Sequence, residues 1–467
     1  MVGPGVARNS VLSVEQRTGV VEGIQAVAGA VVKWICVQDG AREHYAIPRA
    51  LHRGGRLALL GTEFWGGRAL HGLRAGPMQA LGSRWHPDLD GARIISWNAH
   101  YLWRRFNRAV KGGNNSYESF VRNGRWVSEH VRDWLVRHKV ELGDKMVFCY
   151  DTTALELFQW AKTRGTTRLL GQMDPNRVEF ELVRDEEKRW PGWALRPVDV
   201  PEEYLARRAK EWALAECVLV NSEFCRQALL RQGVPEEKLV VVPLCYERKA
   251  QKFGAEVTQE GIANRKSTID KSQSECARQK NTRPIRVLFL GQVILRKGIQ
   301  YLVEAAKLLH GENVFFDVVG PIGISDAALK SAPPNVFFHG RVMRDKANEW
   351  YRRASLFVLP TVSDGFAISQ LEAMAHGLSV IATPNCGEVV THGEDGFIVP
   401  IRDSFALASA IQSYLKNPGI LAAHSAAALK KVARFSLESL SQKLQELERE
   451  TANLRLSDAN PHQRLSA

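Results

Sequence analysis

Residues 356–382 read LFVLPTVSDGFAISQLEAMAHGLSVIA, and this stretch is the most informative part of the chain. Its apolar ends, 356–360 and 378–382, have the length of buried parallel strands. Between them, Asp364 falls in a loop at the end of a strand, and Glu372 falls about two turns into the next helix. Open α/β sheets bind ligands beyond the carboxyl ends of their strands, and a turn entering a helix offers N–H groups to an anion. The arrangement suits phosphate, ribose or sugar; the alternative is a helix with a polar start and one surface Glu.

Strands and helices alternate through the rest of the chain, in two series separated by a polar segment. The first series of expected strands is 31–37, 56–61, 92–97, 145–150, 166–171, 217–220 and 239–243. The second is 285–291, 314–319, 336–339, 356–359, 378–382 and 397–399. Helices are expected at 42–52, 117–138 and 154–164, and after Asn221. Alternation of this kind predicts parallel sheets, so we expect an α/β protein with two Rossmann-like, doubly wound domains facing across a cleft.

The chain of 467 residues exceeds a single ordinary core, which also favours two domains. We expect a loosely ordered N-terminus at 1–25, a first domain at 26–246, a flexible linker or insertion at 247–283, a second domain at 284–434, and a C-terminal helix and tail at 435–467. The linker is rich in Lys, Arg, Gln and Ser and has almost no apolar clusters. Four leucines mark the last helix, which we expect to dock on the body because its pattern covers under two heptads.

The composition favours a soluble, cytoplasmic protein. Hydrophobic residues make up 45% and charged residues 24%, which is ordinary for a globular chain. The longest apolar stretch, near 27–37, contains Lys33 and is too short to span a bilayer, and no signal-peptide pattern opens the chain. Seven scattered cysteines show no paired or metal-binding spacing.

The formal net charge of +13 leaves three readings open. The surface is basic without a specific partner, or it contacts an anionic membrane that carries lipid-linked acceptors, or it binds nucleic acid. The chain has no helix-turn-helix, zinc-finger or RNA-recognition signature, so we do not predict a nucleic-acid partner. Peripheral contact with the inner face of a membrane stays as one of the two remaining readings.

Several motifs, in a fixed order, resemble family 4 of the retaining GT-B glycosyltransferases, the glycosyl transferases of group 1. The family has two acids separated by seven residues, and its helix motif is intact here as Leu371-Glu372-Ala373-Met374-Ala375. The loop motif departs twice, with Asp364 for Glu and Ala367 for Gly. The resemblance covers about 285–416 and, more weakly, 218–243. It implies the GT-B layout, with a nucleotide-sugar donor in the second domain and an acceptor in the first.

The segment Gly291–Gly298 also follows a strand and opens a helix. Lys297 precedes the helix start, where a cation and the helix dipole can together hold a diphosphate, and the resemblance implies the same role. The family usually has a basic residue where Gln292 stands; Arg296 is the candidate replacement, unless its side chain points to solvent. The other donor-binding residues that the resemblance implies are Gly340 and Val342 near the base, Asp364, Gly365 and Phe366 near the transferred sugar, and Glu372 at the ribose.

The family often places a His or an acid after a strand in the middle of the first domain. The matching stretch, 169–176, has no His, so Asp174 is the candidate for orienting the acceptor and joins Lys297 and Asp364 in the predicted catalytic set. The alternative for Asp174 is a capping role before a proline. Gly40 and His44 follow the first strand and are expected to line the acceptor side, with an ordinary helix-surface position as the alternative for His44.

We predict neither a metal nor another cofactor. Asp88-Leu89-Asp90 has the spacing of a metal–diphosphate motif, but no apolar strand precedes it, and we interpret it as a turn. Lysine and helix-terminus charge can replace a metal beside a diphosphate.

The predicted function is retaining, metal-independent transfer of a sugar from a nucleotide-sugar donor to a glycan, lipid-linked or small-molecule acceptor. The resemblance implies a hexosyltransferase-type glycosyltransferase of cell-surface polysaccharide or glycoconjugate synthesis. Two alternatives remain: a GT-B nucleotide-sugar epimerase or hydrolase, and a catalytically silent nucleotide-sugar-binding protein. The departures at Gln292 and Asp364 keep the silent protein in consideration.

Overall fold

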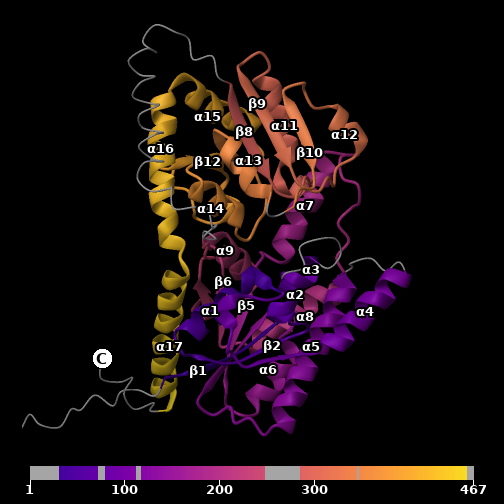
Figure 1. Ribbon diagram of the computed structural model, residues 1–467, viewed down its shortest axis with the longest axis vertical. Helices are drawn as coiled ribbons and strands as arrows, with labels where there is room; N and C mark the ends of the chain where they lie inside the picture. The colour runs from indigo at the N-terminus through magenta and orange to yellow at the C-terminus, as the bar shows by residue number, and fades with distance from the viewer. Residues whose placement is uncertain (1–30, 72–78, 112–116, 248–283, 344–345, 460–467) are drawn as a thin grey trace, which may run out of the picture.

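The computed structural model describes residues 31–71, 79–111, 117–247, 284–343 and 346–459 (Figure 1). Two parallel sheets form the centres of two domains. Their strand orders are β3-β2-β1-β4-β5-β6-β7 and β10-β9-β8-β11-β12-β13. In each sheet the order reverses beside its first strand, which defines a doubly wound fold, so the predicted α/β fold class is confirmed. The N-terminus predicted at 1–25 and nearly all of the linker predicted at 247–283 lie outside the described residues.

The first sheet consists of β1 (Lys33–Gln38), β2 (Leu57–Thr62), β3 (Ile94–Ser96), β4 (Lys145–Tyr150), β5 (Thr167–Gln172), β6 (Cys217–Val220) and β7 (Leu239–Val241). The second consists of β8 (Ile285–Leu290), β9 (Val314–Val319), β10 (Val336–Gly340), β11 (Leu356–Leu359), β12 (Ser379–Ala382) and β13 (Gly396–Ile398). Each strand lies within two residues of the position that its apolar run predicts.

The helices before β8 are α1 (Ala46–Arg53), α2 (Gly67–His71), α3 (Gln79–Gly82), α4 (Asn98–Lys111), α5 (Tyr117–Arg137), α6 (Leu155–Lys162), α7 (Arg177–Arg189), α8 (Glu202–Leu214) and α9 (Glu223–Arg231). Those after it are α11 (Ile299–Leu308), α12 (Asp326–Lys330), α13 (Ala347–Arg353), α14 (Ile368–Ala375), α15 (Ser404–Lys416), α16 (Pro418–Lys431) and α17 (Leu437–Ala459). None of the helices within the described residues combines the length and the apolar character that crossing a bilayer would require.

Strand β1 shows why the apolar runs predict the sheet well. Side chains alternate between the two faces of a strand, and both faces of a parallel sheet are covered. Ile35 and Val37 therefore join the core beneath α5 and α6, while Trp34 and Cys36 join the core on the opposite face. All four are at most 1% exposed, so the strand reads as continuously apolar.

The start of the helix predicted at 42–52 is wrong, because the helix begins four residues later. Residues Arg42–Tyr45 form a tight turn in which Glu43, His44 and Tyr45 all have positive φ, and α1 begins only at Ala46. Pro48 explains the boundary: proline has no N–H to donate four residues back, and its ring would clash with that carbonyl group, so a helix tolerates it only in the first turn.

Helix α17 docks on the first domain although it follows the second in sequence. Figure 1 shows α16 and α17 running in succession along one side of both domains. The leucines at 437, 440, 444 and 447 are at most 6% exposed and pack in the core that covers Trp34. The Trp34 indole N–H also donates to Glu448 Oε1 at 2.6 Å. Helix α17 therefore packs beside α1 on the same face of the first sheet and covers the part of that face that α1 does not reach.

Helix α7 follows β5 of the first sheet but packs on the second domain (Figure 1). The fully buried carboxylate of Glu186 accepts hydrogen bonds from the Tyr301 hydroxyl at 2.6 Å and from Gln300 Nε2 at 2.9 Å. Its other oxygen lies 2.5 Å from Arg402 Nε. A buried charge needs a counter-charge and saturated hydrogen bonds, and Glu186 receives both only while α7 stays on the second domain.

The core position of Leu444 predicts a loss of stability on truncation. Leu444→Ala should lower the free energy of unfolding by about 2–5 kcal/mol, because the rigid core around it relaxes only partly into the cavity. Leu429→Ala is the matched control, since Leu429 on α16 is 39% exposed, and surface substitutions stay within about 0.5 kcal/mol. Urea denaturation of both variants measures the difference. Equal midpoints would show that α17 is not part of the core of the first domain.

Candidate functional site

The loops after β8 and β11 meet beside the point where the strand order of the second sheet reverses. The Val362 backbone N–H donates to the Arg296 carbonyl oxygen at 2.9 Å. Gly298 has a φ of 74°, and a Cβ placed there would lie 1.7 Å from the Pro360 carbonyl oxygen. Only glycine allows this approach, which brings the two motifs found in the sequence into direct contact.

Three charged side chains meet where these loops touch. The Lys297 ammonium donates a hydrogen bond to Asp364 Oδ2, and Arg296 Nη1 lies 3.6 Å from Asp364 Oδ1. Burial by itself would raise the pKa of Asp364, but the charges of Lys297 and Arg296 outweigh burial and hold that pKa below its usual value. Arg296 also donates to the Ser363 carbonyl oxygen at 2.9 Å, so its guanidinium turns into the site. The arrangement gathers two cations and an ionised carboxylate at a strand end.

Glu372 lies on α14, the helix that the Asp364 loop enters. The Tyr351 hydroxyl donates to Glu372 Oε2 at 2.8 Å, and the carboxylate is half-buried. This hydrogen bond fixes the side chain, as a carboxylate that receives ribose hydroxyl groups would require.

The other residues predicted to bind the donor differ in how far they are exposed and in their backbone conformation. Gln292 is exposed, Val342 is half-buried, and Gly340 has a φ of 68° with open space where a Cβ would be. Phe366 is 8% exposed and belongs to the core of the second domain, so only its backbone is available to a ligand. A Cβ on Gly365 would lie 1.9 Å from the Met173 carbonyl oxygen, so this glycine lets the loop touch the first domain.

Glu179 completes the site from the first domain, and the sequence analysis missed it. It lies in the first turn of α7, and its Oε2 is 3.2 Å from Arg296 Nη1 and accepts a hydrogen bond from Ser363 Oγ at 3.1 Å. Burial raises the pKa of Glu179; Arg296 opposes that shift, and Asp174 and Asp364 add to it. The sequence could have indicated Glu179, because it is an acidic residue in the first turn of the helix that follows a predicted strand.

Asp174 follows β5, and its Oδ1 has three partners in the first domain. It lies 2.6 Å from Arg208 Nη2, and it accepts hydrogen bonds from the Asn176 backbone N–H at 2.8 Å and from Gln172 Nε2 at 3.3 Å. The bond to Asn176 closes the turn before α7, but the N-cap of that helix is Asn176 without a side-chain cap, so the capping role given as the alternative for Asp174 is wrong. Arg208 is fully buried and also pairs with Asp151 at 2.7 Å. The Asp174 side chain is 33% exposed, so the turn hydrogen bond and the ion pair leave part of it accessible.

A second group of polar side chains lies at the strand ends of the first domain. Asp39 follows β1 and Glu63 follows β2, and the Asn123 amide donates to both carboxylates. Burial, followed by the hydrogen bond and charge of Glu63, raises the pKa of Asp39 to about 8. Burial also acts to raise the pKa of Glu63, but the hydrogen bond from Asp39 and then the charge of Arg84 outweigh burial and lower that pKa. At neutral pH this acid pair therefore retains one proton.

Of the two predicted acceptor-side residues, Gly40 directly follows Asp39 of this acid pair. Gly40 has a φ of 80°, and its carbonyl oxygen accepts a hydrogen bond from Gln38 Nε2 at 2.7 Å. His44 stands in the left-handed turn before α1, so its alternative position on a helix surface is wrong.

No group of three or more His, Cys, Asp or Glu side chains among the described residues has an arrangement suited to a metal ion. Asp88 instead pairs with Arg49 at 2.8 Å and with Arg53 at 2.6 Å, in the short turn Pro87–Leu89.

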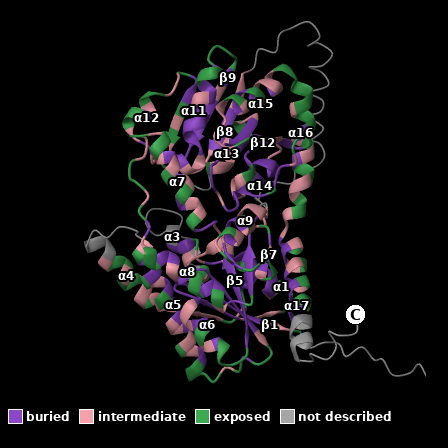
Figure 2. Cartoon of the chain, turned by 180° about the vertical axis from the view of Figure 1, so that it is seen from behind, coloured by how far each residue is buried: buried purple, intermediate pink, exposed green. Residues whose placement is uncertain are grey.

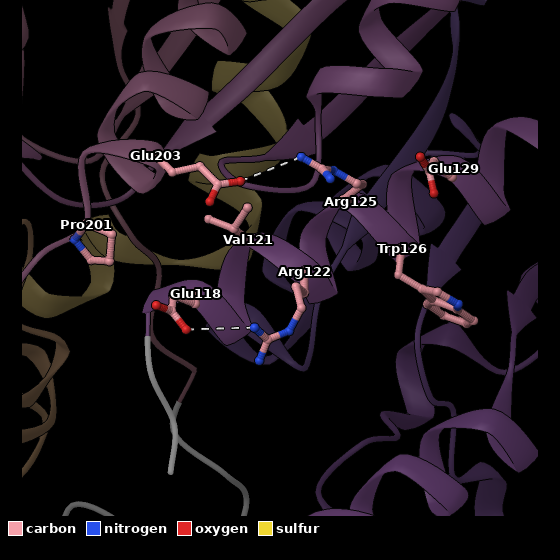
Figure 3. A pocket seen from close by; sticks show the side chains of 8 residues that line it. All are labelled: Glu118, Val121, Arg122, Arg125, Trp126, Glu129, Pro201 and Glu203. Carbon is pink, nitrogen blue, oxygen red and sulfur yellow. Dashed lines mark ion pairs between the residues drawn. The ribbon is translucent and has the colours of Figure 1, made fainter. Parts of the chain in front are cut away.

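A hollow of about 520 Å³ lies between the first half of α5 and the start of α8 (Figure 3). Its two arginines are each paired with a glutamate, Arg122 with Glu118 at 3.8 Å and Arg125 with Glu203 at 3.7 Å. Because the charges compensate, the hollow does not offer a surplus cation to a phosphate. The chemistry of the site is concentrated at the strand ends.

Residues 284–417 match the model of a family described as glycosyl transferases group 1. The lipopolysaccharide core biosynthesis mannosyltransferase LpcC of Rhizobium leguminosarum bv. viciae is 36% identical over 139 residues, which are 29% of this chain and 36% of that protein. Sucrose-phosphate synthase from Thermosynechococcus elongatus has a TM-score of 0.60 at 18% identity, and Anabaena HepE in complex with UDP has 0.57 at 14%. Each structural match covers 90% of this chain and 100% of the other.

Two doubly wound domains with a charged site at their strand ends define the GT-B class of fold. Within that class, the resemblance to the group 1 glycosyl transferases lies in the second domain, where residues 284–417 match the family model. The chain spans about a third to three fifths of the length of the curated relatives it matches.

The proton held by Asp39 predicts a pH-dependent stability. Since its pKa in the folded protein is raised to about 8, Asp39 contributes stability that is complete below its unfolded pKa and is lost as the pH rises through about 8. Because the pKa of Glu63 is lowered, Glu63 stays ionised near pH 8 and does not contribute to this loss of stability. Asp39→Asn should therefore show a smaller drop in Tm between pH 6 and pH 9 than the unmodified protein. Asp133→Asn, at a half-exposed acid on α5, is the control; if both variants follow the unmodified protein, Asp39 does not hold the proton.

Proposed function

We propose that the protein is a glycosyltransferase that moves a sugar from a nucleotide-sugar donor to a glycan, lipid-linked or small-molecule acceptor. The observation that carries the proposal is the contact of Arg296, Lys297 and Asp364 at the strand ends of a group 1 glycosyltransferase domain. The mannosyltransferase relative acts in lipopolysaccharide core synthesis, as its name states, so we propose a role in lipopolysaccharide or another cell-surface polysaccharide. The HepE complex makes UDP the first nucleotide to test.

The chemistry follows from where charge develops. Breaking the bond between sugar and phosphate puts negative charge on the leaving diphosphate, and preorganised cations stabilise that charge in the transition state. Lys297 and Arg296 supply two cations, so we propose that transfer needs no metal. Asp364 would accept hydrogen bonds from the transferred sugar, and Glu372 from the ribose.

We propose that the reaction retains the configuration of the sugar, as in the family that the sequence resembles. The leaving phosphate would take the proton of the acceptor hydroxyl while attack occurs on the same face, so a protein nucleophile is not required. Asp174 and Glu179 stand at the edge of the first domain beside the two cations, where they can orient the acceptor. The protein would act in the cytoplasm, at the surface of a membrane that carries the acceptor.

The first experiment is a thermal-shift screen with UDP-, GDP- and ADP-sugars, in the presence and absence of EDTA. A donor at 100 times its Kd stabilises the folded state by about 2.7 kcal/mol. Turnover of the donor that binds is then measured with and without candidate acceptors. Release of the nucleotide without an acceptor would favour an epimerase or hydrolase, and binding without turnover would favour a silent binding protein. Activity that EDTA abolishes would contradict metal independence.

Lys297→Ala should lower kcat by roughly 100-fold or more, the scale of losing one preorganised group that stabilises transition-state charge. Lys307→Ala is the matched control, because Lys307 lies on α11 with a 40% exposed side chain and pairs with Glu304 one turn away. Steady-state kinetics with the donor found in the screen measure both variants. A raised KM with normal kcat would mean that Lys297 binds the substrate and the transition state equally well. Normal kinetics would mean that Lys297 has no role at the site.

Glu179→Gln should strengthen the binding of the free nucleoside diphosphate, by about threefold to tenfold. Gln can still accept the hydrogen bonds of Arg296 and Ser363, but it no longer neutralises the guanidinium, and hydrogen bonds between charged groups are worth about 1.5–3 kcal/mol. Glu181→Gln, on an exposed side chain of the same helix, controls for the change in net charge. Titration calorimetry gives both affinities. Weaker binding by the Glu179 variant would mean that Glu179 holds Arg296 in place for the ligand instead of competing with it.

A further inference from the structure

Tyr351 on α13 has a buried hydroxyl group whose hydrogen bond reaches the predicted ribose site. The residue is 1% exposed, and its hydroxyl oxygen lies 2.8 Å from Glu372 Oε2 and 3.5 Å from the Ser369 carbonyl oxygen, both on α14. A phenol has one hydrogen to donate, and the shorter hydrogen bond to the ionised carboxylate is the stronger one. The hydroxyl of Tyr351 is therefore directed at Glu372.

The ring of Tyr351 is packed so that this hydrogen bond is held in place. It stacks on His376 with centroids 5.0 Å apart and an interplanar angle of 19°, and it lies 6.0 Å from the ring of Phe357 on β11. Tyr351 and Phe357 both belong to the core of the second domain. His376 Nδ1 lies 2.7 Å from the Glu372 carbonyl oxygen, and because a carbonyl oxygen only accepts, Nδ1 carries the hydrogen. The phenol, the imidazole and the carboxylate therefore pack as one unit.

This unit joins two helices of the second domain that follow different strands. Helix α13 is the next helix after β10, whose end carries Gly340 near the predicted base site, and α14 carries Glu372. Figure 2 shows α13 and α14 as neighbours, and α14 is mostly buried. The direction of the Glu372 carboxylate is thus set by a residue outside the motif that contains Asp364 and Glu372.

A carboxylate held in this way makes the site sensitive to each hydroxyl group of the ribose. Glu372 is half-buried, and an ionised carboxylate has about four lone-pair positions, so one phenol does not saturate it. When a ligand lacks a hydroxyl group, a held carboxylate loses that hydrogen bond and cannot turn toward water to replace it. A carboxylate that could turn would recover the bond from water, and the ligand would bind almost as well. Sites that hydrogen-bond a hydroxyl group reject analogues without it for this reason.

We propose that Tyr351 is a positioning residue that makes the site selective for ribonucleotides over 2′-deoxyribonucleotides, because it holds the Glu372 carboxylate toward both vicinal hydroxyl groups of the ribose. The inference rests on the proposed function only in taking Glu372 as the residue that meets the ribose, and it does not require sugar transfer. Because Tyr351 is buried, it acts through Glu372 and does not touch the reacting groups.

The test is titration calorimetry of the full chain with UDP, GDP and ADP, each compared with its 2′-deoxy analogue. The unmodified protein should bind the ribonucleotide about tenfold more tightly or better, the scale of one hydrogen bond to a charged group. Tyr351→Phe keeps the ring and removes the hydroxyl, so it should lower this affinity ratio about threefold or more, because the carboxylate can then turn to water.

Tyr414→Phe is the matched control, because Tyr414 is also a fully buried tyrosine of the second domain. Its hydroxyl oxygen lies 2.6 Å from Ser379 Oγ and 2.8 Å from His424 Nδ1. Ser379 begins β12, so this contact lies at the end of the strand away from the site. The control loses a buried hydroxyl hydrogen bond in the same domain, and its affinity ratio should equal that of the unmodified protein.

A double variant separates a positioning role from a merely structural one. Glu372→Ala should itself lower the ratio to near one, and adding Tyr351→Phe to it should change the ratio no further, since the hydroxyl acts only through the carboxylate. Circular dichroism checks that each variant folds. Should Tyr351→Phe not fold, Tyr351→Met replaces it, because a methionine side chain adapts to an apolar site, and the same loss of ratio is expected.

The inference is overturned if the unmodified protein binds both kinds of nucleotide equally well, if Tyr351→Phe or Glu372→Ala keeps the full ratio, or if Tyr414→Phe loses it equally. A further loss in the double variant would also overturn it. A ratio that falls as expected, in a protein that binds nucleotides but transfers no sugar, would refute the proposed function and leave this inference standing. Sugar transfer with an unchanged ratio in Tyr351→Phe would do the reverse, and absence of binding of all three diphosphates would overturn both.

Discussion

The site depends on one side chain that both domains hold, the guanidinium of Arg296. It follows β8 of the second domain, yet its Nη1 is shared among the Ser363 carbonyl oxygen, Asp364 and Glu179 of the first domain. Such a group is stable in a largely buried position only while its counter-charges are present. The charged site of the second domain is therefore completed by a residue of the first domain.

Helix α7 makes this sharing possible. Glu179, at the start of α7, contacts the loops that follow β8 and β11 of the second domain. The buried Glu186, further along the helix, contacts Arg402 and Tyr301. Removing one partner of a buried ion pair costs about 3–5 kcal/mol, so the contact at Glu186 fixes where the first turn of α7 lies. The position of a charge at the site is thus set by a contact about two turns away along the same helix.

Backbone strain gathers at the strand ends that surround the site. Among the described residues, those other than glycine with positive φ follow β1 at Glu43–Tyr45, β4 at Thr152, β5 at Asn176 and β13 at Arg402, apart from Lys139, which follows α5. Each such residue costs of order 1–3 kcal/mol and persists only where the surroundings impose it. Thr152 and Asn176 are buried, and the side chain of Arg402 is tied to α7. The strain is therefore held by the same packing that brings the two domains together.

The sequence by itself determined the sheet strands and the place of Lys297, Asp364 and Glu372 in the segments that follow β8 and β11. Runs of apolar residues are local, and both faces of a parallel sheet are buried, so every strand from β1 to β13 could be predicted from its own residues. The motifs at Lys297, Asp364 and Glu372 were equally readable, because a strand end followed by a helix start is also a local pattern. Only the tertiary structure decided which charges meet. Glu179 reaches Arg296, Asn123 joins Asp39 to Glu63, and Phe366 turns into the core, since these contacts join residues far apart in the chain.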